Sequence, residues 1–218
     1  MRILHLTFIA LIIASSSFVA LEPVTLAWAT ADQLLARTQP CDAVSTGRYT
    51  THDNPTARVP VCRSGPAYFW HAGMSIDCDG VATPRCNAGT DPAYQALTLY
   101  RGADGRYLTA DEARYFVIPL PSSRFDYRSA GIAPGNVGAI VYDGKVVYGI
   151  FADVGPETAI GEASYATAVA LGINPDPGHG GVSGGVTYVV FPGQFPDDTG
   201  TSAINQVGAA AAAAFVRG

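Results

Sequence analysis

Three carboxylates occur close together in the segment FADVGPETAIGEASYA, residues 151–166. Asp153 lies just after the apolar run VVYGIF and two residues before Gly155-Pro156, which predicts a position at the end of a strand. Glu162 opens a segment rich in helix formers, so we expect it at the start of a helix. Glu157 lies in the loop between them, where we expect it to be exposed to solvent.

Asp153 and Glu162 are a candidate acid–base pair. Hydrolysis of a glycosidic bond needs one protonated carboxyl at the leaving oxygen and one ionised carboxyl on the other side. These groups stand about 6.5–9.5 Å apart when the second activates water, and about 5–5.5 Å apart when it attacks directly. The eight residues between Asp153 and Glu162 can fold back or reach over about 20 Å. Spacing therefore leaves a second interpretation open, a solvated turn at Asp153 and helix capping by Glu162.

The expected helix start also bears on which carboxyl holds the proton. A helix N-terminus favours the ionised form of a carboxylate, whereas a general acid must be protonated in the resting enzyme. Burial or a neighbouring carboxylate would have to outweigh the helix dipole at Glu162. The order of acid and base stays open.

A second acidic cluster, SIDCDG, contains Asp77 and Asp79 on either side of Cys78. Alternation places both carboxylates on one face of an extended strand. Such a pair suits an ammonium-bearing ligand. The pair also resembles part of a calcium loop, although the downstream glutamate of an EF-hand is missing. A third interpretation is an exposed acidic turn. No histidine has a partner at ligand spacing, so the sequence does not support a metal site. We also expect no cofactor.

The N-terminus has the pattern of a secretory signal peptide. Met1-Arg2 is followed by an apolar run and then by small residues, with cleavage expected after Ala20 or as late as Ala29. The run is shorter than the roughly 20 residues of a membrane-spanning helix, so a membrane anchor is the weaker alternative. We expect a secreted, extracellular protein with no membrane association after cleavage.

Four cysteines, Cys41, Cys62, Cys78 and Cys86, predict two disulfides in an oxidising compartment. Three connectivities are possible, and we favour the sequential one, Cys41–Cys62 and Cys78–Cys86. Zinc is the competing interpretation, but no C-x-x-C pair supports it.

The net charge is negative. The chain carries 13 Lys and Arg against 18 Asp and Glu, and loss of Arg2 with the leader gives 12 − 18 = −6. Such a surface does not attract a phosphate backbone, which argues against nucleic acid, and it suits a cationic partner. A monomer is the default expectation.

Residues 41–218 are expected to form a single domain, without repeats or a flexible linker. The 24 Gly and 15 Pro exclude a mainly helical fold. Asp143-Gly144 predicts a tight hairpin. Strands are expected near 67–70, leading towards MSIDCDG, and near 96–101, 113–121, 137–154 and 185–193. Helices are expected over 161–173 and in the tail from 201. This pattern predicts a mainly β protein, a compact β-barrel with a few short helices.

Several sequence blocks, in order from about residue 65 to residue 193, resemble the fungal-type chitosanases of glycoside hydrolase family 75. The blocks are MSIDCDG, YFVIP, AIVYDGKVVYGIFADVGP, IGEASYATAVALGINPDP and GGVTYVVFPG. The resemblance implies a secreted endo-hydrolase of chitosan, the β-1,4-linked polymer of glucosamine. It also implies a barrel related to the double-psi barrels.

The same resemblance implies an inverting mechanism with one Asp and one Glu. The family motifs D-x-G-P and G-E-x-S contain Asp153 and Glu162, which would be the base that activates water and the acid, respectively. Asp77 and Asp79 become candidates for binding the amines of the substrate. Tyr165 is a candidate face for a sugar ring.

Tyr68 and Trp70 are further candidate faces for sugar rings. Two other functions stay open beside the chitosanase. One is a non-catalytic polysaccharide- or wall-binding module on the same barrel, and the other is a hydrolase of another polysaccharide.

Overall fold

The computed structural model describes residues 28–52 and 54–218 of the chain. The predicted signal peptide, residues 1–20, lies outside the described residues. Helix α1 (Ala31–Arg37) precedes the expected domain start at residue 41 and packs against the C-terminal helix α3 (Thr201–Arg217). None of the helices in the described part of the chain is long and apolar enough to cross a membrane.

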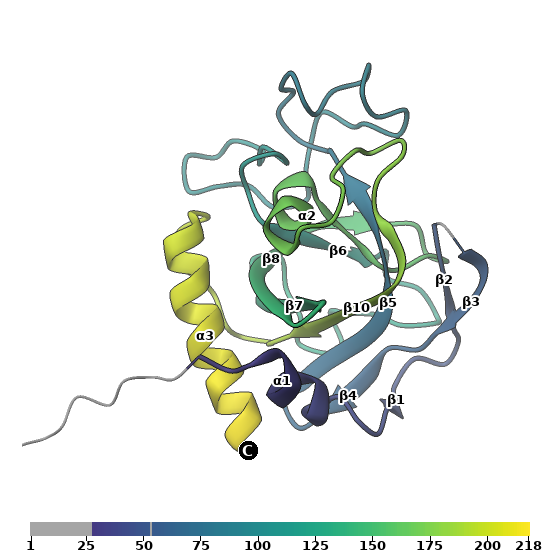
Figure 1. Ribbon diagram of the computed structural model, residues 1–218, viewed down its shortest axis with the longest axis vertical. Helices are drawn as coiled ribbons and strands as arrows, with labels where there is room; N and C mark the ends of the chain where they lie inside the picture. Colours follow the sequence, from purple (N-terminus) through teal and green to yellow (C-terminus); the bar gives the residue numbers. More distant parts are fainter. Residues whose placement is uncertain (1–27, 53) are drawn as a thin grey trace, which may run out of the picture.

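Six strands close into a barrel (Figure 1). Neighbouring strands are hydrogen-bonded in the order β5, β10, β7, β8, β6, β9, and β9 pairs back with β5. The pairings β5–β9 and β6–β8 are parallel. The bounds are β5 (Ala67–Asp77), β6 (Tyr115–Pro119), β7 (Val137–Tyr142), β8 (Lys145–Gly155), β9 (Glu162–Ser164) and β10 (Val182–Val190). The prediction of a mainly β, compact barrel with helices is confirmed.

Four short strands lie outside the ring. Strand β4 (Cys62–Ser64) pairs with the start of β5, and β1 (Asp42–Ala43) pairs with β4. A separate hairpin consists of β2 (Tyr49–Thr51) and β3 (Asn54–Val59).

The barrel wall has two buried faces. Alternate residues of all six strands fill the interior, and α2 (Tyr165–Leu171) adds apolar residues to this cluster. The largest fully buried side chains that these strands place in the interior are Trp70, Met74, Phe116, Ile118, Ile140, Phe151 and Tyr188. The other residues of β5–β8 and β10 face outward, and helices α1 and α3 cover part of that outer face. Because both faces are covered, side-chain direction along each strand is strongly specified.

The hairpin predicted at Asp143-Gly144 is confirmed. Strands β7 and β8 pair in register up to Tyr142–Lys145. Asp143 has φ 47° and Gly144 has φ 72°, the positive values that a two-residue turn of this kind needs.

Helix α2 begins three residues later than Glu162. The Oγ of Ser164 accepts a hydrogen bond from Thr167 N (3.2 Å) and caps the helix. Glu162 precedes this cap and lies on β9, paired with Ser75 of β5. The expectation of Glu162 at a helix start is therefore wrong, and so is the helix-dipole argument that depended on it. The predicted closing helix in the tail is present as α3.

The strand expected at 96–101 is absent from the described structure. Leu97 and Leu99, two apolar residues of this segment, are 48% and 42% exposed. Only an isolated bridge joins Arg101 to Tyr107. The segment is instead part of a long loop that crosses the outer face of the barrel, and Tyr100 N donates to the carbonyl of Ala152 on β8 (2.9 Å).

The two disulfides are Cys41–Cys62 and Cys78–Cys86, which confirms the favoured sequential connectivity. The first attaches the segment before β1 to β4. The second closes a short loop directly after β5, next to Asp77 and Asp79.

Candidate active site

A bulge in β8 determines where Asp153 points. Phe116 of β6 pairs with Phe151, but the next residue, Val117, pairs with Asp153, so Ala152 is an extra residue in the ladder. Phe116 and Phe151 belong to the interior cluster, whereas Val117 and Ala152 belong to the outer one. Bulges often re-aim side chains beside functional sites. Here the extra residue places Asp153 on the outer face of the barrel.

Asp153 is buried at this position, with 6% of its surface exposed. Its Oδ1 accepts hydrogen bonds from Val154 N (2.7 Å) and Leu99 N (3.3 Å). Its Oδ2 is buried without a hydrogen-bond partner in the described part of the chain. Burial raises the pKa of Asp153 to about 6, with a smaller contribution in the same direction from Glu162, against the effect of the two backbone donors.

Glu162 reaches the same face from β9. Ala163 packs in the interior cluster, so its neighbour Glu162 points outward. The Oε2 of Glu162 lies 3.3 Å from the position that a Cβ on Gly155 would occupy, which places the carboxylate beside the end of β8. The same Oε2 is 3.5 Å from His52 Nε2.

His52 belongs to the β2–β3 hairpin, which is fixed to the loop preceding Glu162. Thr50 N donates to Thr158 O (2.9 Å), and Ile160 N donates to Thr50 O (3.0 Å). These bonds hold the hairpin parallel to residues 158–160. Backbone hydrogen bonds between the hairpin and this loop therefore hold His52 in contact with Glu162.

Asp77 and Asp79 follow each other at the end of β5. Asp77 is 5% exposed, and its Oδ1 accepts hydrogen bonds from Asp79 N (2.7 Å) and from the hydroxyl of Tyr115 (3.0 Å). Asp79 is half-buried, and its Oδ1 accepts a hydrogen bond from Gln95 N (2.6 Å). Burial raises the pKa of Asp79 to about 7. It raises the pKa of Asp77 well above its usual value, with further contributions from Glu162, Asp79 and Asp153.

One carboxylate oxygen from each of Asp77, Asp79 and Asp153 lies within 4.8 Å of the other two. Three ionised carboxylates this close repel one another strongly. A proton, an ammonium group or a metal cation would relieve the repulsion, and oxygen ligands suit hard cations. The expectation that no metal takes part stays a prediction.

The structure thus brings together four of the seven residues predicted for catalysis and substrate binding, and all four are carboxylates: Asp77, Asp79, Asp153 and Glu162. Tyr165 begins α2 and lines a cavity with Pro92, Asn174 and their neighbours. Its assignment to sugar binding stays a prediction.

The two other aromatic candidates for sugar binding lie in different surroundings. Trp70 is fully buried inside the barrel and stacks on Tyr188 (5.3 Å between ring centroids), so it cannot present a face to a sugar. Tyr68 packs against Phe125 and beneath Arg63. Glu157 is exposed in the loop, as expected.

Two residues of the site were not predicted from the sequence. Tyr115 lies in a strand that the sequence did indicate, but nothing local shows that its hydroxyl reaches Asp77. His52 lies 110 positions before Glu162, in a hairpin that the apolar pattern did not reveal. Both contacts depend on strand pairing between distant segments.

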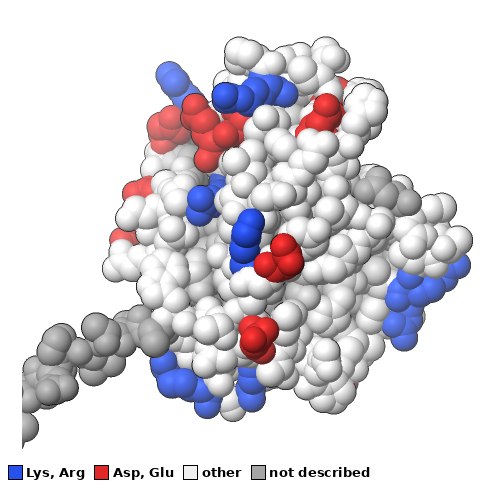
Figure 2. All heavy atoms as spheres, viewed as in Figure 1, with Lys and Arg blue, Asp and Glu red and all other residues white. Residues whose placement is uncertain are grey.

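The wider surface is uneven in charge. On the face shown in Figure 2, acidic side chains gather in the upper part, together with several basic ones, over the loops near α2. Basic side chains lie at the lower edge near the C-terminal end of α3 and beside β3.

Curated relatives of this chain are fungal endo-chitosanases. Endo-chitosanase B of Aspergillus oryzae is 30% identical over 132 residues, which cover 57% of this chain and 55% of the relative. Endo-chitosanase of Aspergillus fumigatus is 30% identical over 129 residues, which cover 56% of this chain and 54% of the relative. Endo-chitosanase C of Aspergillus oryzae is 35% identical over 136 residues, which cover 59% of this chain and 32% of the relative. The chain therefore spans about half the length, or less, of these relatives.

Among solved structures, the Streptomyces papain inhibitor (SPI) is similar to 56% of this chain and 94% of its own, with 18% identity and a TM-score of 0.32. The family model described as fungal chitosanase of glycosyl hydrolase group 75 matches residues 74–215. This match covers more than half of the chain and includes all four clustered carboxylates. The chain therefore belongs to the fungal chitosanase family of glycosyl hydrolase group 75.

Proposed function

We propose that this protein is a secreted endo-chitosanase that hydrolyses β-1,4 glucosaminidic bonds with inversion. The observation that supports this most is the placement of Asp153 and Glu162, from two different strands, on one face of the barrel beside Asp77 and Asp79. Family membership and the names of the relatives support chitosan as the substrate.

The strand order supports an inverting mechanism. Strand β6 alone separates β8, which carries Asp153, from β9, which carries Glu162. Two strand spacings of about 4.8 Å put the backbones of these residues about 10 Å apart. Side chains on one face at that spacing leave room for a water molecule beside the sugar, as an inverting pair requires.

In this mechanism Asp153 is the base and Glu162 is the acid. With a pKa of about 6, Asp153 is largely ionised at neutral pH yet basic enough to take a proton from water. Its Oδ2, which has no partner among the described residues, is the acceptor for that water. Glu162 donates its proton to the leaving oxygen.

The proposed acid, Glu162, has His52 beside it, with Nε2 of the ring 3.5 Å from Oε2 of the carboxyl. Neutral His52 can hydrogen-bond the protonated acid and orient it. The acid–base order is therefore open to a direct test with the two single variants.

Asp79 and Asp77 supply the preference for glucosamine. Each unit of chitosan can carry an ammonium group, and a bound ammonium keeps a neighbouring carboxylate ionised. Asp79 is the more accessible of the two and makes the direct contact. Asp77, held by the hydroxyl of Tyr115, supports it from the buried side.

Two disulfides and the predicted signal peptide support export, because disulfides persist in oxidising compartments. We propose that the mature enzyme acts outside the cell as a monomer. It needs neither nucleic acid nor a membrane.

The function is tested by incubating the purified chain with chitosan, chitin and cellulose and measuring new reducing ends. We expect release from chitosan that falls as the degree of acetylation rises, with a rapid loss of viscosity that marks internal cleavage. Binding to chitosan without new reducing ends over days would identify a non-catalytic module. Preferential cleavage of chitin or cellulose would identify a different hydrolase. Glu157→Gln, a change at an exposed carboxylate in the same loop, is the control.

A further inference from the structure

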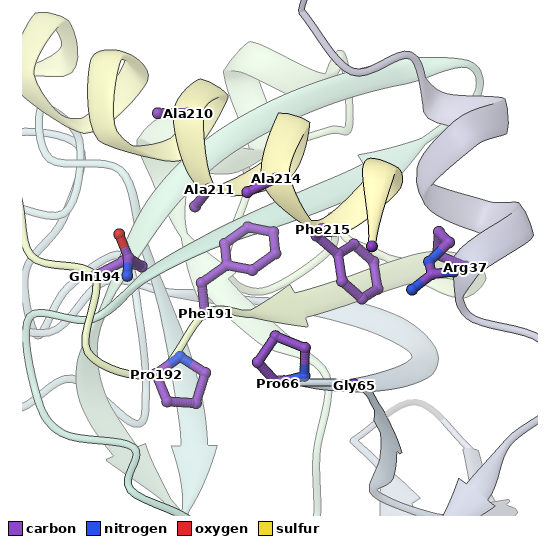
Figure 3. A pocket seen from close by; sticks show the side chains of 11 residues that line it. Arg37, Gly65, Pro66, Phe191, Pro192, Gln194, Ala210, Ala211, Ala214 and Phe215 are labelled. Atoms are coloured by element: carbon purple, nitrogen blue, oxygen red, sulfur yellow. The ribbon is translucent and has the colours of Figure 1, made fainter.

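A second cavity opens at the other end of the barrel, between α1, α3 and the end of β10 (Figure 3). Its volume is about 400 Å³, within the range of small-molecule sites. Phe191, Phe215, Pro66 and Pro192 form most of its apolar wall, and Arg37 lies at one side.

This cavity is remote from the clustered carboxylates. Pro66 immediately precedes β5, and Asp77 ends that strand eleven residues further on. At about 3.3 Å per residue the two sites are separated by about 35 Å of strand. The cavity is therefore not part of the cleft proposed for chitosan.

Arg37 is the charged side chain of the cavity, which Gln194 also lines. Its Nε is buried and has no hydrogen-bond partner in residues 28–52 and 54–218. Its guanidinium lies over the ring of Phe215, 5.5 Å from the centroid. A buried donor without an acceptor is costly, and a carboxylate pairs with a guanidinium in a bidentate way. We therefore expect an anion to pair with the guanidinium of Arg37.

Two further arginines lie near the cavity, while Gly218, whose carboxylate ends the described chain, is among the residues that line it. Arg217 lies in the last turn of α3, and Arg63 lies on β4 next to the turn that contains Gly65. Neither forms an ion pair with the described residues, although Asp42 faces Arg63 across the β1–β4 pairing. In a chain with net charge −5, this is a locally basic surface around an apolar cavity.

We propose that this cavity binds an aliphatic carboxylate, with the anionic head on Arg37 and the chain between Phe191, Phe215 and Pro192. Since a group of the size of water occupies about 30 Å³, a chain of about ten carbons fits the volume. The proposal is independent of the proposed hydrolytic function. The ligand can come from free fatty acids or from an anionic lipid surface, which share this chemistry.

The test is a calorimetric titration of the full chain with decanoate, with decanol and decyltrimethylammonium as matched ligands. We expect saturable binding of decanoate at least about tenfold tighter than that of either matched ligand, since a hydrogen bond to a charged group contributes that much. Arg37→Met should remove this preference. Arg58→Met, at an exposed arginine on β3, should leave it unchanged.

A second variant tests the apolar part without removing any contact. Ala214 lines the cavity and is exposed on α3, so Ala214→Leu fills the space while the helix is retained. We expect this variant to lose decanoate binding at least about tenfold, because the added side chain occupies the ligand's place. Gln206→Leu, on an exposed part of the same helix, is the control.

Co-sedimentation with anionic and zwitterionic vesicles separates the two sources of ligand. Binding to anionic vesicles that Arg37→Met abolishes supports a lipid surface, and decanoate binding without vesicle binding supports a free acid. The proposal is overturned if decanoate and decanol bind equally. It is also overturned if Arg37→Met and Arg58→Met behave alike. A dimer that Ala214→Leu disrupts, without any decanoate binding, would show that a second copy covers this face.

Discussion

The two ends of β5 differ in charge and in what surrounds them. Where the strand begins, an apolar cavity lies beside Arg37, with further arginines near it. Where it ends, Asp77 and Asp79 meet Asp153 and Glu162, and His52 is the basic side chain in contact with Glu162. The same covered barrel wall supports both ends. We therefore expect function at either end to depend on a few side chains that the wall holds in fixed directions.

The largest effect should come from the carboxylate end. Asp153→Asn and Glu162→Gln should each lower chitosan hydrolysis by about 10³-fold or more, since a positioned acid or base contributes about 10²–10⁴-fold. Asn at position 153 can still accept from Val154 N and Leu99 N, so the fold should persist by circular dichroism. Ala214→Leu, at the other end, should keep activity within about twofold.

These two variants also separate acid from base. If Asp153 is the base, added azide should restore cleavage to Asp153→Asn, and a substrate with a fluoride leaving group should restore it to Glu162→Gln. The opposite pattern of rescue would exchange the roles. Near-normal turnover by either variant would remove it from the mechanism.

Substitution of Gly155, at the end of β8, should have a smaller effect on activity at the same site. A Cβ on Gly155 would stand 3.2 Å from Val117 Cγ1 and 3.3 Å from Glu162 Oε2, so Gly155→Ala should displace the Glu162 carboxylate. We expect kcat to fall about tenfold, because small misplacements of catalytic groups are costly. Gly184→Ala, where nothing lies within 4 Å, is the matched control. Equal activity of the two variants would show that Glu162 is not held in place by this contact.

Substrate charge is tested at Asp79. Asp79→Asn keeps an oxygen for Gln95 N but loses the charge, so KM for chitosan should rise about tenfold with a smaller change in kcat. The effect should shrink on highly acetylated chitosan, which carries fewer ammonium groups. Asp104→Asn, in an exposed turn, should change neither constant. A rise in KM that is independent of acetylation would contradict an ammonium contact.

The raised pKa values also predict a pH dependence of stability. Asp79 and Asp153 have pKa values of about 7 and about 6 in the folded chain, above the unfolded value of about 3.9. The folded state thus binds more protons between about pH 4 and 7, and its stability falls as pH rises through this window. Asp79→Asn should therefore raise Tm at pH 8 by a few degrees more than at pH 4. An equal shift in Tm at both pH values would mean that ionisation of Asp79 does not destabilise the folded chain.

Metal removal should have the smallest effect. Activity after dialysis against EDTA should match untreated enzyme within about 20%, because acid–base hydrolysis by two carboxylates needs no metal. A loss that Ca²⁺ restores would instead assign a cation to Asp77, Asp79 and Asp153.

Local patterns in the sequence predicted the parts of the fold that depend on neighbouring residues. Asp143-Gly144 fixed the hairpin between β7 and β8, and the alanine-rich tail indicated α3. The end of the strand at Gly155-Pro156 also agreed with the structure. In each case turn chemistry or helix propensity acts within a few residues.

Features that depend on distant pairing were not predictable in this way. The extra residue in β8 that turns Asp153 outward is defined only by β6. Glu162 lies in a strand because β5 pairs with it, although its neighbours favour a helix. The contact between Tyr115 and Asp77, and that of His52 with Glu162, likewise need the closed barrel. The resemblance to a family identified the pair, and the structure showed where each member lies.

The central claim is that Asp153 and Glu162 act on opposite sides of the glycosidic bond with water as the nucleophile. Proton NMR of the first products of a chitosan oligomer tests it most directly, because the anomeric signal reports the configuration before mutarotation. We predict that the α-anomer appears first, from a β-linked substrate. Initial formation of the β-anomer would show retention and would contradict this account.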